Sequence, residues 1–555
     1  MINRRSAVKG LAALGFTLSG TRWANAATDG AQPSDVIKTT HGPVRGSIAK
    51  QIVSFRGIPY GSPTGGDARF LPAKAPTAWA AVRDATAYGD SCPQLGFGVS
   101  PFAKSGRNEP PPPPSAIQKQ LSLLFPRDKP ETYSENCLVL NVWTPATDAK
   151  RRPVMVWLHG GGFAQGSGSS SMFDGTRLAQ RGDVVVVTIN HRLNVFGYLY
   201  LGEIAGEAYA SSGNLGMLDI VAALSWVRDN IGAFGGDPGN VTIFGESGGA
   251  GKVSVLCAMP AAQGLFHKAI MQSGPALRVS DTSHGTAIAR QLLKDLGLGE
   301  RDVAALRRVD ADKLTRAADE AERKVVPRII GVGPMGMSPI IDAVVLKHHP
   351  FDAAAPPESA QVPFLVGSNQ DESVLFLGGM PDWGRLTDAD VLERIRPVVG
   401  ARSEAALQLY KRLYPTDSAS YLFAAITTDA WMRRAANRVG ELKVQQQAAP
   451  VYTYVLDWQV TPDLRTPHAL DVPLVFDNVQ STPGTESASG AQAVADQMSA
   501  AWIAFAHTGN PNTAALPHWP AYSLPDRASM VFNVKSRVVS DYGKTQREFW
   551  DKGPT

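Results

Sequence analysis

Residues 241–251 read VTIFGESGGAG and contain the pattern G-x-S-x-G around Ser247. A short apolar run comes before the pattern, and a helix-like run follows it. This order predicts a nucleophile elbow, a tight strand-to-helix turn that exposes a serine hydroxyl. Because such a turn leaves little room, Gly245 and Gly249 remove side chains that would collide with the strand and the helix. The bare pattern is common by chance, so the flanking runs carry the prediction.

A second glycine-rich segment lies earlier, where the apolar run Val154–Leu158 leads into HGGGF at residues 159–163. Three consecutive glycines let the backbone approach a substrate closely and direct N–H groups at it. Acyl transfer needs such donors where negative charge develops on a carbonyl oxygen. A phosphate-binding loop is the alternative, but the Lys-Ser/Thr ending of a nucleotide-binding loop is absent. Together the two segments point to acyl transfer.

Elsewhere in the chain, short apolar runs alternate with longer stretches of helical periodicity, such as residues 218–231 and 493–507. The short apolar runs have the length that is typical of strands buried by helices on both faces. The alternation predicts an α/β fold with a large, mostly parallel sheet flanked by helices. No repeat or linker divides the chain, so we expect a single domain over residues 27–555, with one more edge strand at residues 529–534. The other expected strands are Val154–Leu158, Val184–Ile189, Val241–Phe244, Ala269–Gln272, Phe364–Gly367 and Val451–Leu456.

Residues 1–26 have the features of an export signal. Arg4 and Arg5 come before a weakly apolar run, Gly10–Leu18, and the small-x-small pattern Ala24–Ala26 follows it. The apolar run has nine residues, which is too short to span a bilayer. The paired arginines resemble a twin-arginine signal. We therefore expect the mature protein to be periplasmic or secreted.

The charge balance of the chain changes when this leader is removed. The 555 residues carry 54 Lys and Arg against 50 Asp and Glu, a formal net charge of +4. Four of the bases and none of the acids lie in residues 1–26, so the mature chain is formally neutral. A neutral chain lacks the basic excess of a nucleic-acid-binding protein. No later segment reaches about 18 uninterrupted apolar residues, so we expect no stable insertion into a membrane.

The elbow and the glycine loop resemble those of the type-B carboxylesterase/lipase family, the α/β-hydrolases that include cholinesterases and bacterial para-nitrobenzyl esterases. The likeness extends over residues 35–545. It implies an α/β-hydrolase fold in which insertions form a gorge, and the activity of a serine carboxylic-ester hydrolase acting on small-molecule esters. Further family-like segments are FRGIPY at 55–60, ENCLVLNV at 135–142, NLGMLD at 214–219 and FGGDP at 234–238.

The same resemblance implies a Ser-His-Glu triad. In α/β-hydrolases the nucleophile comes first in the chain, then the acid and then the histidine. His468 begins HALDVPLVF, which is similar to the family segment around its catalytic histidine. Glu372 ends GSNQDE, which matches the family segment G-x-N-x-D-E, with the glutamate as triad acid. Asp371 is its rival by adjacency, and Asp342 is another acid between Ser247 and His468.

The expected chemistry is covalent catalysis through an acyl-enzyme. Ser247 is a poor nucleophile until a base removes its proton, which the triad histidine provides. The resemblance implies that the N–H groups of Gly161, Gly162 and Gly248 form the oxyanion hole. The same resemblance implies that Glu246 lies next to the catalytic residues and supports them.

The resemblance implies that Ser273, like Glu246, supports the catalytic residues. Phe163 follows the glycine loop, and we expect it to line the acyl side of the substrate pocket. Leu375, Phe376 and Trp431 are weaker pocket candidates, since such residues more often belong to a core. Cholinesterases stack a quaternary ammonium on a tryptophan of the loop that corresponds to residues 93–136. Here that loop contains no tryptophan, which argues against a choline esterase.

The three cysteines are Cys92, Cys137 and Cys257. Export permits one disulfide and leaves one free thiol. Cys257 stands in an apolar, helix-like run and is expected to be the buried free thiol. The family resemblance implies a disulfide between Cys92 and Cys137, which flank a polar insertion with a proline tract at residues 110–114. No two cysteines have the C-x-x-C spacing of metal ligands, and we expect neither a metal nor a cofactor.

Other classes of protein use the same residues or the same fold. An amidase, a carbamate hydrolase or a transacylase would use the same triad. Some relatives are adhesion proteins that keep the fold and lack the catalytic serine. Because Ser247, Glu372, His468 and the glycine loop are all present, the sequence favours an enzyme, whose ester could be alkyl, aryl, phthalate, lactone or an esterified natural product.

Overall fold

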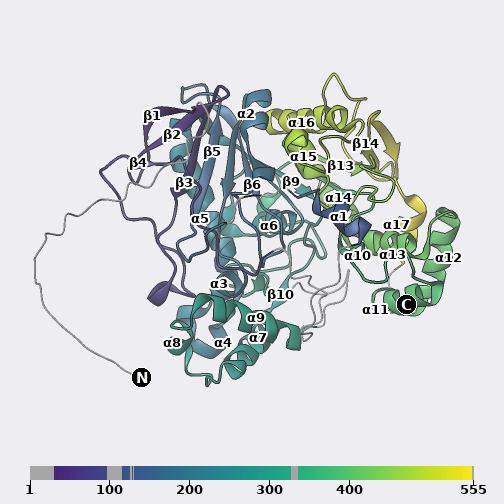
Figure 1. The fold of residues 1–555 in the computed structure, drawn as a ribbon, viewed down its shortest axis with the longest axis horizontal. Coiled ribbons are helices and arrows are strands. Elements are labelled where there is room, and N and C mark those ends of the chain that lie inside the picture. Colours follow the sequence, from purple (N-terminus) through teal and green to yellow (C-terminus); the bar gives the residue numbers. More distant parts are fainter. Residues whose placement is uncertain (1–30, 97–114, 126–127, 129–130, 327–335, 553–555) are drawn as a thin grey trace, which may run out of the picture.

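A computed structural model describes residues 31–96, 115–125, 128, 131–326 and 336–552. The predicted export signal and the proline tract at residues 110–114 lie outside these ranges. Thirteen strands form one large sheet, and two short strands form a second sheet. Strands from both ends of the described chain belong to the large sheet, with the N-terminal strands (purple) and β14 (yellow) far apart in Figure 1.

The order of the large sheet is β1-β2-β3-β5-β7-β6-β8-β9-β12-β13-β14-β15, with β4 paired to β2. All neighbours from β7 to β14 are parallel. In contrast, β1, β2, β3 and β5 form an antiparallel series that joins β7. The strands are β1 (Gln32–Lys38), β2 (Pro43–Ala49), β3 (Ile52–Pro59), β4 (Arg83–Asp84), β5 (Val139–Thr144), β6 (Arg152–Leu158), β7 (Val185–Ile189), β8 (Gly236–Glu246), β9 (Lys268–Gln272), β12 (Phe364–Asn369), β13 (Val451–Leu456), β14 (Ala528–Phe532) and β15 (Arg537–Ser540).

The six strands predicted from apolar runs are all present and lie side by side in the parallel part of the sheet. The prediction for residues 529–534 is correct for a strand but wrong for an edge. The strand there, β14, has an outer neighbour because β15 pairs with it antiparallel. The side chains of β15 are half-buried or exposed, so no apolar run signals it in the sequence.

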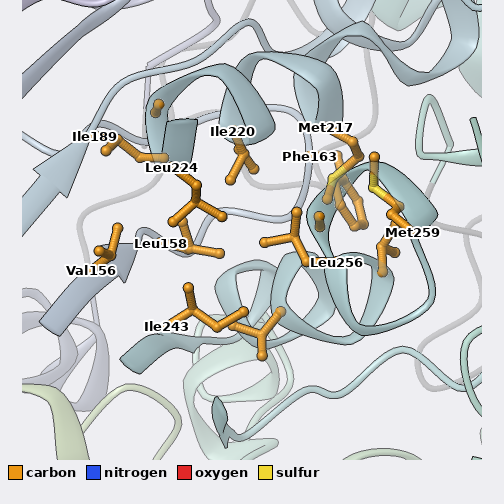
Figure 2. Close-up of a cluster of buried hydrophobic side chains, with 14 of the residues drawn as sticks. Val156, Leu158, Phe163, Ile189, Met217, Ile220, Leu224, Ile243, Leu256 and Met259 are labelled. Atoms are coloured by element: carbon orange, nitrogen blue, oxygen red, sulfur yellow. The ribbon is translucent and has the colours of Figure 1, made fainter. Parts of the chain in front are cut away.

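Alternate residues of β6 belong to two different hydrophobic cores, one on each face of the sheet. Val156 and Leu158 pack on one face against α5 and α6, and Figure 2 shows this cluster with Leu224 and Leu256. Trp157 faces the opposite core, which α16 covers. The flanking helices are α2 (Thr176–Gly182), α5 (Leu215–Asn230), α6 (Gly248–Cys257) and α16 (Ala491–Thr508).

Two helical groups extend these cores and lie apart in Figure 1. One contains α7 (Thr282–Asp295), α8 (Val303–Leu306) and α9 (Ala311–Val325), beside the small sheet of β10 (Ser280–Asp281) and β11 (Ile340–Ile341). The other contains α11 (Asp388–Val399), α12 (Ser403–Leu413), α13 (Ala419–Thr428) and α14 (Arg434–Gln446).

In the described ranges we find no helix long and apolar enough to cross a membrane. Shorter helices are α3 (Asn194–Tyr198), α4 (Gly202–Ala205), α10 (Val374–Leu377), α15 (Asp471–Val475) and α17 (Lys544–Asp551).

The described part of the insertion at residues 93–136 contains a short helix, α1 (Ala116–Ser122). Its apolar side chains Ile117 and Leu121 are buried in the core on the α16 side. Gln118 Nε2 donates a hydrogen bond to the carbonyl of Gly379, 2.9 Å away. The insertion therefore packs directly on the segment that follows the candidate triad acid.

Candidate active site

Ser247 occupies the sharp turn between β8 and α6. Its backbone angles, φ 59° and ψ −125°, are unfavourable for a residue with a side chain. The turn is held because the Ser247 N–H donates a 2.9 Å hydrogen bond to the carbonyl of Gln272 on the neighbouring strand β9. The serine thus sits at the N-terminus of a ten-residue helix, where the helix dipole stabilises negative charge.

The glycines beside Ser247 are required by close backbone contacts. A Cβ on Gly249 would lie 2.0 Å from the carbonyl oxygen of Leu158, and one on Gly245 would lie 2.6 Å from the carbonyl carbon of Gly249. This bears out the steric reason given for the pattern from the sequence. It also shows that the elbow presses against the end of β6, from which the glycine loop starts.

His468 and Glu372 meet at the ends of β13 and β12. His468 Nδ1 lies 2.6 Å from Glu372 Oε2, and both side chains are buried. The backbone N–H of Asn369 donates to Glu372 Oε1 at 2.7 Å, which fixes the carboxylate. Because the carboxylate can only accept, Nδ1 carries the proton, and Nε2 is the free basic nitrogen.

The rival acids are occupied elsewhere. Asp371 lies 3.7 Å from Arg465, and its backbone N–H donates to the carbonyl of Thr466. Asp342 accepts a 2.9 Å hydrogen bond from Asn214 and caps the following backbone turn. Of the three acids weighed from the sequence, Glu372 is the one in contact with His468.

A second carboxylate faces the other nitrogen of the imidazole. Glu246 Oε1 lies 3.1 Å from His468 Nε2, within ion-pair distance but without hydrogen-bond geometry. Burial alone would lower the pKa of His468, but Glu246 and Glu372 outweigh this and raise it to about 9. Burial raises the pKa of Glu246 to about 8, against the opposing effect of the imidazole.

Asp471, three residues after His468, is a buried acid for which the sequence predicts no role. Its Oδ2 accepts hydrogen bonds from Gln272 Nε2 at 2.8 Å and from the hydroxyl of Tyr454 at 3.0 Å. Burial raises the pKa of Asp471, and the charge of Glu372 adds to this. The only signal in the sequence is its position three residues after His468.

The glycine loop folds over the elbow. Gly161 and Gly162 have φ values of 83° and 65°, which favour glycine. A Cβ on Gly248 would lie 2.2 Å from the carbonyl oxygen of Gly162, so the loop and the head of α6 are in direct contact. From within α6, the buried Lys252 Nζ donates a 2.8 Å hydrogen bond to the carbonyl of His159 at the start of the loop.

A cavity of about 640 Å³ opens beside Ser247, and its lining includes Phe163, Ser273 and Trp431. Ser273 has a left-handed φ of 54°, and its buried hydroxyl makes no hydrogen bond within the described residues. Strain and an unpaired polar atom at one position are typical of functional sites.

The remaining pocket candidates are placed differently. Leu375 packs against the core on the α16 side. Phe376 is absent from the described cavity lining, but its ring centre lies 5.0 Å from that of His468 and 5.6 Å from that of Trp431. The Phe376 ring therefore lies between the imidazole of His468 and Trp431 of the cavity wall.

All three cysteines are buried free thiols in the structure, so the disulfide stays a prediction. Cys92 and Cys137 nevertheless lie next to each other, since a side-chain hydrogen bond joins the two thiols and, together with burial, raises the pKa of Cys137. Cys257 is fully buried in α6, as its apolar surroundings predict. Across the described ranges, no group of three or more His, Cys, Asp or Glu could hold a metal ion.

Comparison with known proteins places this chain in a family. The model of the carboxylesterase family matches residues 33–550. The chain belongs to the carboxylesterase family. Its curated relatives include esterases that hydrolyse carboxylic esters, and carboxylic-ester hydrolysis is the activity of this chain.

The sequences of individual relatives align with nearly the whole chain. The para-nitrobenzyl esterase of Bacillus subtilis (strain 168) is 36% identical over 528 residues, covering 93% of this carboxylesterase and 99% of the relative. The phenmedipham hydrolase of Pseudarthrobacter oxydans is 30% identical over 516 residues, covering 91% and 96%. The solved structure of the Geobacillus stearothermophilus carboxylesterase EST55 matches with a TM-score of 0.79 at 38% identity, covering 93% and 99%. The α/β-hydrolase fold expected from the sequence is confirmed.

Proposed function

We propose that this carboxylesterase hydrolyses small-molecule esters through an acyl-enzyme on Ser247, with His468 as general base and Glu372 as the acid that orients it. The observation that carries the proposal is the buried 2.6 Å contact between His468 Nδ1 and Glu372 Oε2. It fixes one imidazole tautomer, with the proton on Nδ1, so that Nε2 is the nitrogen left to act as the base.

In the first half of the reaction, the Ser247 hydroxyl attacks the ester carbonyl carbon while His468 Nε2 takes the hydroxyl proton. The carbonyl oxygen becomes an oxyanion, which the N–H groups of Gly161, Gly162 and Gly248 stabilise together with the dipole of α6. When the intermediate collapses, the C–O bond to the alcohol breaks and His468 gives its proton to the leaving oxygen. The products are the free alcohol and an acyl group on Ser247.

In the second half, water takes the place of the alcohol. His468 removes a proton from the water, the hydroxyl oxygen attacks the acyl carbon, and Ser247 regains its proton as the acid leaves. In both halves the imidazole becomes an imidazolium, whose charge is favoured by Glu372 on one side and Glu246 on the other.

The test is the loss of turnover in Ser247→Ala and His468→Ala, with Ser225→Ala on α5 as the matched control. We expect kcat to fall by roughly 10⁴-fold or more in the two site variants, because a triad acts as a unit, and to stay unchanged in the control. An active-site-directed phosphonate should label the native protein at Ser247, as mapped by mass spectrometry. Full activity in Ser247→Ala, or labelling at another serine, would contradict the proposal.

We also propose that residues 1–26 direct export and that Cys92 and Cys137 form a disulfide in the oxidising compartment. The paired arginines and the small-x-small pattern support the first proposal. The contact between the two buried thiols supports the second, since bridged cysteines must lie close together.

A further inference from the structure

Two arginines of α14, Arg434 and Arg438, line the cavity that contains Ser247. They are four residues apart, so they stand one turn above each other on the same helix face. Like charges at this spacing oppose each other in an isolated helix. The pair therefore destabilises the helix unless a negative charge lies next to it.

The acidic residues of the cavity supply little of that negative charge, because each lies closer to another arginine. Among the described residues, Arg434 has no ion-pair partner, and Arg438 reaches only one carboxylate oxygen of Glu441, at 3.8 Å. Glu441 itself is held at 3.1 Å by Arg527. The other engaged pairs are Asp352–Arg278 at 2.5 Å, Asp429–Arg433 at 2.7 Å and Asp551–Arg547 at 2.8 Å.

The helix places both arginines on the wall of the cavity that Ser247 also lines. Trp431 lies on the π-helical turn Asp429–Arg433 that runs directly into α14, and its ring contacts Phe376, which contacts His468. At a rise of about 1.5 Å per residue, Arg434 and Arg438 follow Trp431 by about 5 and 10 Å along the helix axis. They continue the same cavity wall away from the imidazole.

We propose that Arg434 and Arg438 bind an ionised carboxyl group of the substrate, so that this carboxylesterase prefers esters of molecules that carry a second, free carboxylate. A guanidinium presents parallel N–H donors that match the two oxygens of a carboxylate, and a neighbouring cation strengthens the contact. This inference rests on the proposed function, since it takes Ser247 as the point of attack. It adds a half-ester of a dicarboxylic acid, or an acidic alcohol, as the class of substrate.

The test compares pairs of esters that differ only in the charged group. On the acyl side, mono-4-nitrophenyl glutarate is paired with 4-nitrophenyl 5-methylhexanoate, in which two methyl groups replace the carboxylate oxygens. On the alcohol side, 4-carboxyphenyl acetate is paired with 4-isopropylphenyl acetate. The ratio of kcat/KM within each pair, corrected for the uncatalysed rate, measures the preference for the anion. We expect the native protein to favour the anionic member in at least one pair, and that pair identifies the side that faces α14.

Arg434→Gln and the double variant Arg434→Gln/Arg438→Gln separate recognition from chemistry. For the favoured pair, we expect kcat/KM of the anionic member to fall about tenfold in the single variant and further in the double variant. The neutral member should stay within about twofold, because neither arginine touches the triad. Arg396→Gln, an exposed arginine of α11 outside the cavity lining, is the matched control and should change neither member. Added salt should weaken the preference of the native protein.

Two results would overturn the inference: a native protein that favours the neutral member of both pairs, or a double variant that lowers both members of a pair equally. These are distinct from failure of the proposed function. If Ser247→Ala still hydrolyses the neutral esters, the proposed function fails. If Ser247-dependent hydrolysis of neutral esters is present without a preference for anions, only the arginine site is wrong. Calorimetric titration of Ser247→Ala with glutarate gives an independent readout, since binding should disappear in Ser247→Ala/Arg434→Gln/Arg438→Gln.

Discussion

The imidazole of His468 lies between two carboxylates, which meet different nitrogens. Glu372 accepts a hydrogen bond from Nδ1–H and is held by a backbone N–H, so it orients the ring. Glu246 faces Nε2, the nitrogen that takes the serine proton in the proposed mechanism. Both carboxylates stabilise the charged imidazole, which helps when the imidazolium forms but also keeps the resting ring protonated to a higher pH.

Replacing Glu246 by Gln tests this balance through the pH profile. The base is the neutral imidazole, so activity rises with pH through the pKa of His468, which the two carboxylates raise to about 9. Loss of the Glu246 charge lowers that pKa, so the rising limb of kcat/KM should move to lower pH. The plateau should fall by about tenfold for each unit by which that pKa drops, because one pKa unit corresponds to about 1.4 kcal/mol of imidazolium stabilisation.

The control for this prediction is Glu404→Gln, which removes an exposed carboxylate on α12. Its pH profile should coincide with that of the native protein. A Glu246→Gln variant whose rising limb stays in place would show that Glu246 does not act on the proton of His468.

At the level of elements, the elbow depends on the register of two parallel strands. Leu158, the last residue of β6, pairs with Gly245 on β8. This register directs the Leu158 carbonyl at Gly249 in the first turn of α6. The nucleophile and the glycine loop are therefore positioned by the same strand pair, so one backbone contact holds both parts of the catalytic geometry.

A methyl group at Gly249 should disrupt this contact. The Cβ of Gly249→Ala would lie 2.0 Å from a backbone oxygen that cannot rotate away, so β6 and α6 must separate. We expect the free energy of unfolding to fall by about 2–3 kcal/mol, measured by urea titration, with a loss of esterase activity. Gly232→Ala is the control, since its added Cβ meets nothing within 4 Å. Equal stability of the two variants would contradict the steric role of Gly249.

For the whole molecule, sequence patterns predicted the strands and site residues that a short stretch of neighbouring residues identifies. The parallel strands were evident because burial on both faces leaves continuous apolar runs, as in β6 and β7. The antiparallel strands β1 and β2 were not predicted, because each has only two buried residues and forms no continuous apolar run. The triad residues carry distinctive local motifs, whereas Arg434 and Arg438 show no pattern, and only the packing of α14 brings them to the cavity.

The proposed disulfide between Cys92 and Cys137 gives a prediction for the whole molecule, to be tested on protein purified after the proposed export. A bond there would close a long loop, part of which packs on the segment that follows Glu372. Closing such a loop restricts the unfolded chain, so the Cys92→Ser/Cys137→Ser variant of exported protein should be less stable by about 2–4 kcal/mol in urea titrations. Reductant should remove the difference between native protein and variant, which is the control for the packing effect of the substitutions.

Chemical mapping of the same material decides whether the bond exists. In denatured, exported protein we expect an alkylating reagent to label Cys257 alone before reduction and all three cysteines after it. Protein made without residues 1–26 in a reducing cytoplasm should be labelled at all three from the start, because glutathione keeps such thiols reduced. Exported protein that takes up label at Cys92 and Cys137 before reduction would contradict the disulfide. An exported chain that keeps residues 1–26 would contradict the cleavage of the leader.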